Sequence, residues 1–180
     1  MVSKWGAVNL EHECGLKVRE LHGLVSAVYG DGDMTAPISS GSFRCDAMLI
    51  APCSARTLGA IASGSGDTLI SRAADVALKE RRRLVLALRE APLSSIHLQN
   101  ALRVSDAGGI VYPLVPTFYA KPLGIEELVD QIAARLVDLC GIETSSLPVW
   151  GESVDLGQDD RQVGQSSEIP GGDDQMGDSV

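Results

Sequence analysis

Four consecutive residues, Ser54, Ala55, Arg56 and Thr57, follow a short apolar run and could bind an anion. The run, residues 46–52 (DAMLIAP), is typical of a buried parallel strand, and a helical pattern begins after it. Free backbone N–H groups at that helix start, with the two hydroxyls, could hold a phosphate or a flavin edge. The residues alone favour a simpler interpretation, an N-cap followed by a Thr in the first turn.

Two basic residues, Arg72 and Lys79, stand seven apart on one predicted helix and therefore on the same face. Asp75 lies between them at ion-pair spacing, so the spacing alone predicts a solvated ion-pair ladder.

The elements that position these residues alternate along the chain. Apolar runs at 46–52, 84–88 and 109–112 predict strands, and periodic patterns predict helices at 5–14, 68–81, 92–106 and 124–139. This alternation predicts an α/β fold, a flavodoxin-like or Rossmann-like parallel sheet covered by helices on both faces. A doubly wound sheet normally has more strands and a first strand–turn–helix unit with phosphate-binding glycines. We therefore expect an N-terminally truncated version of this fold.

Composition and charge limit the other possibilities. The formal charge of −9 is concentrated in residues 151–180, so we predict a folded domain at 1–143 and an acidic, disordered tail at 144–180. No basic stripe suggests nucleic acid binding, and no apolar stretch reaches the roughly 20 residues that span a bilayer. The four scattered cysteines predict free thiols, and we expect a cytoplasmic protein without a metal site.

Several motifs in order and in register resemble one family. They are C-S-x-x-T at 53–57, R-A-A-D-V-x-L-K-E at 72–80, R-E-x-P-L at 89–93 and P-x-F-Y at 116–119. The segments 3–5 (SKW) and 38–43 (ISSGSF) fit the same pattern. Over residues 2–141 the chain resembles the UbiX-type flavin prenyltransferases and the related B subunits of phenolic acid decarboxylases.

The resemblance implies a reaction and assigns roles. The family joins a dimethylallyl group from dimethylallyl phosphate to N5 and C6 of reduced FMN, without a metal. The prenylated FMN then serves UbiD-type decarboxylases of aromatic acids, including those of ubiquinone biosynthesis. Roles in FMN binding fall on Ser3, Ser54, Ala55, Arg56, Thr57 and Arg89. Roles around the prenyl phosphate fall on Arg72, Lys79, Tyr119 and Arg135, and catalytic roles fall on Glu13, Lys79 and Glu90.

The pattern departs from the family at its front. The family's first strand, its G-A-S-G turn and the following helix, roughly 35 residues, have no counterpart, so the role of the turn's Ser cannot be assigned. Either translation starts upstream of Met1 or the gene is truncated, and the intact later motifs favour the first explanation.

Two alternatives to a prenyltransferase stay open. One is an FMN-dependent decarboxylase, or a subunit associated with one, from the same superfamily. The other is an inactive remnant that keeps only assembly contacts. Family members form homo-oligomers, often dodecamers, with active sites between subunits, and the resemblance implies the same assembly here.

Overall fold

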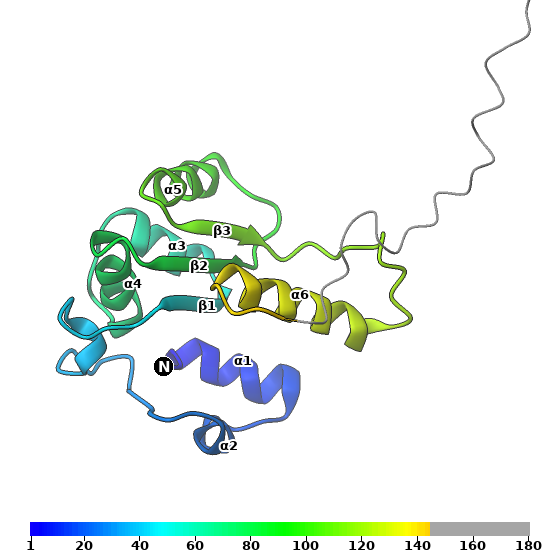
Figure 1. The fold of residues 1–180 in the computed structure, drawn as a ribbon, viewed down its shortest axis with the longest axis horizontal. Helices are drawn as coiled ribbons and strands as arrows, with labels where there is room; N and C mark the ends of the chain where they lie inside the picture. Colours follow the sequence, from blue (N-terminus) through cyan, green and yellow to red (C-terminus); the bar gives the residue numbers. More distant parts are fainter. Residues whose placement is uncertain (145–180) are drawn as a thin grey trace, which may run out of the picture. The chain divides into compact units, whose positions relative to one another are not determined.

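The computed structural model describes residues 1–144, all of which belong to one unit, Met1–Leu147. Its sheet has three parallel strands in the order β1 (Ala47–Cys53), β2 (Arg83–Leu88) and β3 (Ile110–Pro113) (Figure 1). Ala47 pairs with Arg83, and Val85 pairs with Ile110. The three predicted strands are confirmed to within one or two residues at each end.

Helices occupy the positions that the periodicity predicts. The predicted helices are α1 (Lys4–Cys14), α4 (Leu69–Lys79), α5 (Ser95–Asp106) and α6 (Ile125–Leu139). The helix predicted to begin after the first strand is α3 (Ala55–Ala62). The structure also contains α2 (Val18–Leu21) and the 3-10 turns η1 (His22–Leu24) and η2 (Pro37–Ser39). None of the helices in residues 1–144 is both long and apolar enough to cross a membrane.

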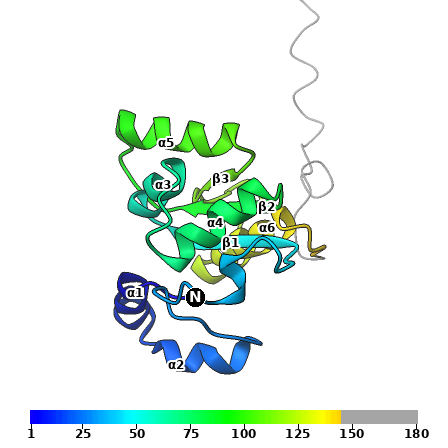
Figure 2. The ribbon, with the colours of Figure 1, turned by 90° about the vertical axis from the view of Figure 1, so that its left-hand side faces the viewer.

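The two faces of β2 are buried by different helices. Leu84, Leu86 and Leu88 pack with residues of α3, α4 and α5. Val85 and Ala87 point to the other face and pack with Leu136 of α6. Because successive side chains of a strand alternate between faces, one buried strand holds both helix layers. The predicted three-layer α/β fold is therefore confirmed (Figure 2).

The prediction that β1 is a fully buried strand is wrong. Only Ile50 and Cys53 are buried in β1, and Leu49 is 38% exposed. Within the part of the chain that the structure describes, β1 pairs with β2 alone and is an edge of the sheet. α1 and α2 lie beyond this edge in both views (Figure 1, Figure 2). No side chain of residues 1–35 is buried.

The predicted acidic, disordered tail falls at residues 144–180. Apart from Thr144, these residues lie outside the described part of the chain, so the tail and the domain boundary at 143 stay predictions.

Candidate functional site at the carboxyl ends of the strands

The segment after β1 forms the start of α3. Ser54 is the N-cap, and its Oγ accepts a hydrogen bond of 3.2 Å from the backbone N of Thr57. The two hydroxyl oxygens lie 3.1 Å apart. The N-cap interpretation is therefore confirmed. It leaves the N–H groups of Ala55 and Arg56 in the first turn, where a helix provides no intrahelical acceptor, so this end keeps donors for an anionic ligand.

Arg89 lies beside this helix start. Its backbone N donates to the carbonyl oxygen of Cys53 at 3.0 Å, which joins the carboxyl ends of β1 and β2. Its guanidinium donates two hydrogen bonds to the Glu13 carboxylate, with N–O distances of 2.7 and 3.1 Å. The bonds lower the pKa of Glu13 and raise the pKa of Arg89. Two residues 76 positions apart, both assigned to the site by resemblance, thus form one ion pair.

An open groove of about 350 Å³ runs from Arg89 along the carboxyl ends of β2 and β3. Its lining is mainly apolar and consists of Leu88, Arg89, Glu90, Ala91, Leu93, Pro113, Leu114 and Val115. An apolar groove with a few convergent polar groups is the usual form of a cofactor site. The apolar lining of the groove suits a flat ring. The first turn of α3 lies outside this lining but is joined to Arg89 through the carbonyl of Cys53, and its N–H groups suit a phosphate. By their chemistry these residues fit FMN.

The basic face of α4 forms a second group. Arg72 Nη1 donates to Asp75 Oδ2 at 3.0 Å, as the spacing predicts. The predicted pairing of Lys79 with Asp75 is wrong, because Lys79 Nζ lies 2.6 Å from Glu80 Oε1. Lys79 is the last residue of α4 and Glu80 is its C-cap, so the carboxylate of Glu80 can turn toward the preceding ammonium. The Lys79 hydrogen bond lowers the pKa of Glu80.

Lys79 and Arg89 lie at opposite ends of the sheet. Three residues separate Lys79 from Arg83, the first residue of β2, so Lys79 is near the amino end of that strand. Arg89 follows its carboxyl end. A strand of six residues spans about 20 Å. One copy of the chain therefore does not bring Lys79 together with Arg89.

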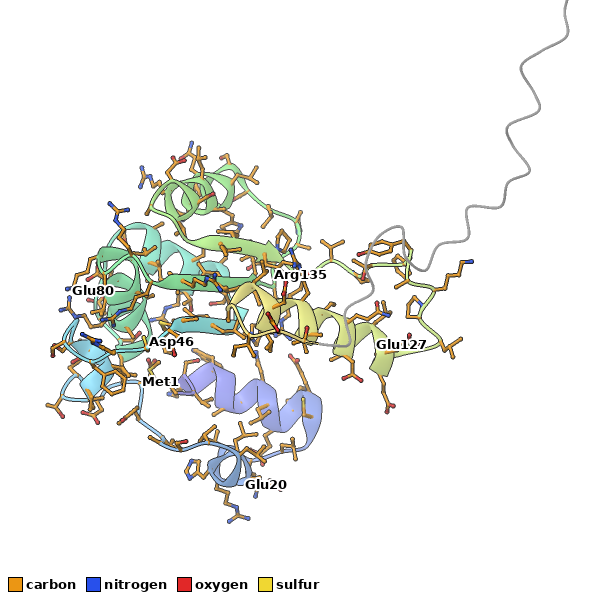
Figure 3. All side chains as sticks on the ribbon, viewed as in Figure 1. Met1, Glu20, Asp46, Glu80, Glu127 and Arg135 are labelled. Carbon is orange, nitrogen blue, oxygen red and sulfur yellow. The ribbon has the colours of Figure 1, made fainter. Side chains whose placement is uncertain are left out.

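The remaining predicted residues are dispersed. Ser3 is the N-cap of α1 and accepts from Gly6 N at 3.0 Å, so Ser3 and Glu13 lie near opposite ends of α1. Tyr119 is 43% exposed in the segment between β3 and α6. Arg135, on α6, pairs with Asp138. Figure 3 shows Arg135 well away from Glu80, the partner of Lys79.

The cysteines, His97 and the acidic side chains form no further site in residues 1–144. All four cysteines are free, as predicted, and burial raises the pKa of Cys53 to about 12. The Nδ1 of His97 accepts from the backbone N of Ser94 at 3.3 Å, a local cap rather than a site group. Across residues 1–144, no three His, Cys, Asp or Glu side chains are grouped to hold a metal.

Sequence reasoning missed Gly41, which lies against Lys79 and Glu80, and Arg82, which holds Gly41 there. Arg82 Nη2 donates to the carbonyl oxygen of Gly41 at 2.7 Å, across 41 residues. No local pattern encodes such a contact. The clue in the sequence was the segment 38–43, which matches the family pattern without an assigned role.

Comparisons with known proteins give the family. The model of the family described as Flavoprotein matches residues 4–137. The flavin prenyltransferase UbiX of Pseudomonas aeruginosa is 53% identical over 125 residues. That alignment covers 69% of this chain and 60% of the relative, so the chain spans about three fifths of the relative's length.

Solved structures agree in sequence and in fold. A UbiX protein (AnUbiX, PadA1) in complex with FMN and dimethylallyl pyrophosphate matches with a TM-score of 0.80 and 49% identity, covering 82% of this chain and 79% of that one. A dodecameric FMN-dependent UbiX-like decarboxylase from Escherichia coli O157:H7 matches with a TM-score of 0.79 and 42% identity, covering 82% and 80%. The chain belongs to the flavoprotein family and, within it, to the UbiX-type flavin prenyltransferases.

Proposed function

We propose that this chain is a flavin prenyltransferase subunit that joins the dimethylallyl group of dimethylallyl phosphate to reduced FMN. The observation that carries the proposal is the Glu13–Arg89 ion pair beside the start of α3. The carboxylate of Glu13 and the guanidinium of Arg89 thus lie next to the first-turn N–H groups of α3. All three are at the carboxyl edge of a parallel sheet, where ligands of α/β folds bind.

In the proposed reaction, the bond between the allylic carbon and the phosphate oxygen breaks, and the carbon skeleton bonds to N5 and C6 of the flavin. Arg72, Lys79 and Arg135 neutralise the charge of the departing phosphate, and the hydroxyl of Tyr119 donates a hydrogen bond to it. Arg89, Ser3 and the first turn of α3 hold FMN. Glu13 and Glu90 transfer the protons of the ring closure, in which N5 and C6 of the flavin each lose a proton and the alkene of the dimethylallyl group gains one.

The assembly is part of the same proposal. Because Lys79 and Arg89 lie at opposite ends of β2 in one copy, a complete site needs the basic face of a second copy. The dodecameric UbiX-like decarboxylase is a precedent for repeated copies. We propose a homo-oligomer, with the product passed to a UbiD-type decarboxylase. The cytoplasmic location stays a prediction.

The direct test is mass spectrometry of the flavin after the chain is incubated anaerobically with reduced FMN and dimethylallyl phosphate. We expect a flavin that carries one additional prenyl group. Lys79→Ala and Tyr119→Phe should raise the KM for the prenyl phosphate and change FMN affinity much less. Recovery of unmodified FMN alone would contradict the proposal, and equal losses in both ligands would contradict these two assignments.

An FMN-dependent decarboxylase is the second candidate, because the chain is also similar to the FMN-dependent UbiX-like decarboxylase of Escherichia coli. The two activities differ in their products. A decarboxylase would release carbon dioxide from an aromatic acid with FMN unchanged, whereas a prenyltransferase alone releases none. Assay of both products in the same incubation separates the candidates.

A further inference from the structure

Two arginines hold residues 39–45 against α4: Arg72, in the first half of the helix, and Arg82, three residues after its last residue. Arg72 Nε donates to the carbonyl oxygen of Ser39 at 3.1 Å. Arg82 donates to two further carbonyl oxygens, from Nη2 to Gly41 and from Nη1 to Phe43, each at 2.7 Å. A guanidinium is a rigid fork with several donors, so it can fix two carbonyls of one segment at once. The path of this segment therefore depends on Arg82.

The segment passes directly over the Lys79–Glu80 ion pair. A Cβ added to Gly41 would lie 2.2 Å from Glu80 Oε1 and 2.8 Å from Lys79 Nζ. Only a hydrogen fits there without displacing the pair, whose own N–O distance is 2.6 Å. The backbone at Gly41 thus limits the directions that the Lys79 ammonium can take.

The charged side chains around this contact, Lys79, Glu80 and Arg82, together carry a net positive charge, which favours binding of an anion. Lys79, through its hydrogen bond and its charge, lowers the pKa of Glu80, and the charge of Arg82 lowers it further. Glu80 therefore stays ionised at neutral pH between two cations, and one net positive charge remains. The guanidinium of Arg82 is occupied by backbone carbonyls, so of these two cations Lys79 is the one placed to meet a phosphate, by exchanging its contact with Glu80.

We propose that Arg82 is a positioning residue for Lys79: it holds residues 39–45 so that Gly41 confines the Lys79 ammonium for the prenyl phosphate. This inference rests on the proposed function. Arg82 itself would not touch the substrate. Its loss should weaken the use of dimethylallyl phosphate while FMN binding, at the other end of β2, stays nearly unchanged.

The test compares Arg82→Lys and Arg82→Met in the full chain with Arg81→Met as the matched control. Arg81 is exposed and next in sequence, so its replacement removes the same charge. We expect both Arg82 variants to raise the KM for dimethylallyl phosphate about tenfold, since charged hydrogen bonds are lost. The kcat and the FMN dissociation constant should change less than about twofold, and Arg81→Met should resemble the wild type.

Gly41→Ala tests the same claim without touching the arginine. The added methyl group meets only the flexible ends of Glu80 and Lys79, so the chain should fold and show the same rise in KM. A wild-type KM in Arg82→Lys would mean that charge, not the fork, acts at position 82, and would overturn the proposal. A parallel loss of FMN binding and thermal stability would reduce Arg82 to a structural residue and would overturn it as well.

A wild-type chain that forms no prenylated flavin would refute the proposed function first. The positioning claim is then judged by calorimetric titration with inorganic pyrophosphate. Weaker binding in Arg82→Lys and Gly41→Ala than in Arg81→Met supports it. Equal binding in all variants, or none in the wild type, overturns it.

Discussion

Residues 1–35 and residues 47–139 are held in place by different forces. The second region contains the buried apolar side chains of the sheet and its helices, with Leu84, Val85 and Leu86 fully buried. The first region buries no side chain, and Trp5 on α1 is 63% exposed. Polar contacts attach it: Glu13 pairs with Arg89, and Asp31 accepts from the backbone N of Leu69 and Ile70.

This difference divides the proposed site into a rigid part and a part that can open. Apolar burial contributes strongly to stability, whereas exposed ion pairs contribute little and are screened by salt. Regions with few buried apolar contacts open locally without global unfolding. Ser54 and Arg89 therefore belong to a preformed surface, while Ser3 and Glu13 arrive with a helix that opens more easily.

Thiol alkylation should show the largest contrast between the two regions. Cys14 is exposed at the end of α1, whereas Cys53 is fully buried at the end of β1 with its pKa raised to about 12. At pH 8 iodoacetamide should modify Cys53 slower than Cys14 by on the order of a thousandfold, because so little thiolate forms there. Peptide mass spectrometry measures both rates, with Cys14→Ser as the control. Equal rates would contradict a closed core.

Leucine truncation should show the next largest contrast. Leu86 is fully buried in β2, so Leu86→Ala should lower the free energy of unfolding by about 3 kcal/mol. Leu24, in the N-terminal region, is 80% exposed, and Leu24→Ala should change it by less than about 0.5 kcal/mol. Urea unfolding followed by circular dichroism measures both. Similar losses would mean that the N-terminal region shares the core's cooperative unfolding.

The smallest effect concerns the ion pair between the regions. Arg89 lowers the pKa of Glu13 below its ordinary 4.5, so the pairing favours the docked helix above that value and is lost as the pH falls through the lowered pKa. NMR of the α1 amides should show the helix loosening only in acid. Glu13→Gln should show that looseness already at pH 7, and Glu11→Gln should not. An unchanged α1 in Glu13→Gln would show that other contacts dock it.

Local patterns predicted most of the fold. The strands were predicted from continuous apolar runs and the helices α4 and α6 from apolar stripes with a period of 3.6 residues, and both patterns are local in the chain. The exposure of β1 could not be predicted from its apolar residues. The exposure of a side chain such as Leu49 depends on which elements pack against the strand and not on the residue type.

The site was less predictable than the fold, because most of its contacts join residues that are far apart in the sequence. The N-cap at Ser54 is local and is confirmed. The Glu13–Arg89 pair and the contacts of Arg82 join residues 76 and about 40 positions apart, which no spacing rule reaches. The partner of Lys79 was mistaken because two carboxylates, Asp75 and Glu80, are both within reach, and the end of the helix decides between them.

The central claim is that this chain binds a flavin where Arg89 meets the start of α3. An anaerobic titration of the chain with reduced FMN, repeated with Arg89→Met, tests it most directly. We predict a dissociation constant of about a micromolar or below, with binding at least about tenfold weaker in the variant. Absence of binding in the wild type, or equal affinity in Arg89→Met, would contradict the account.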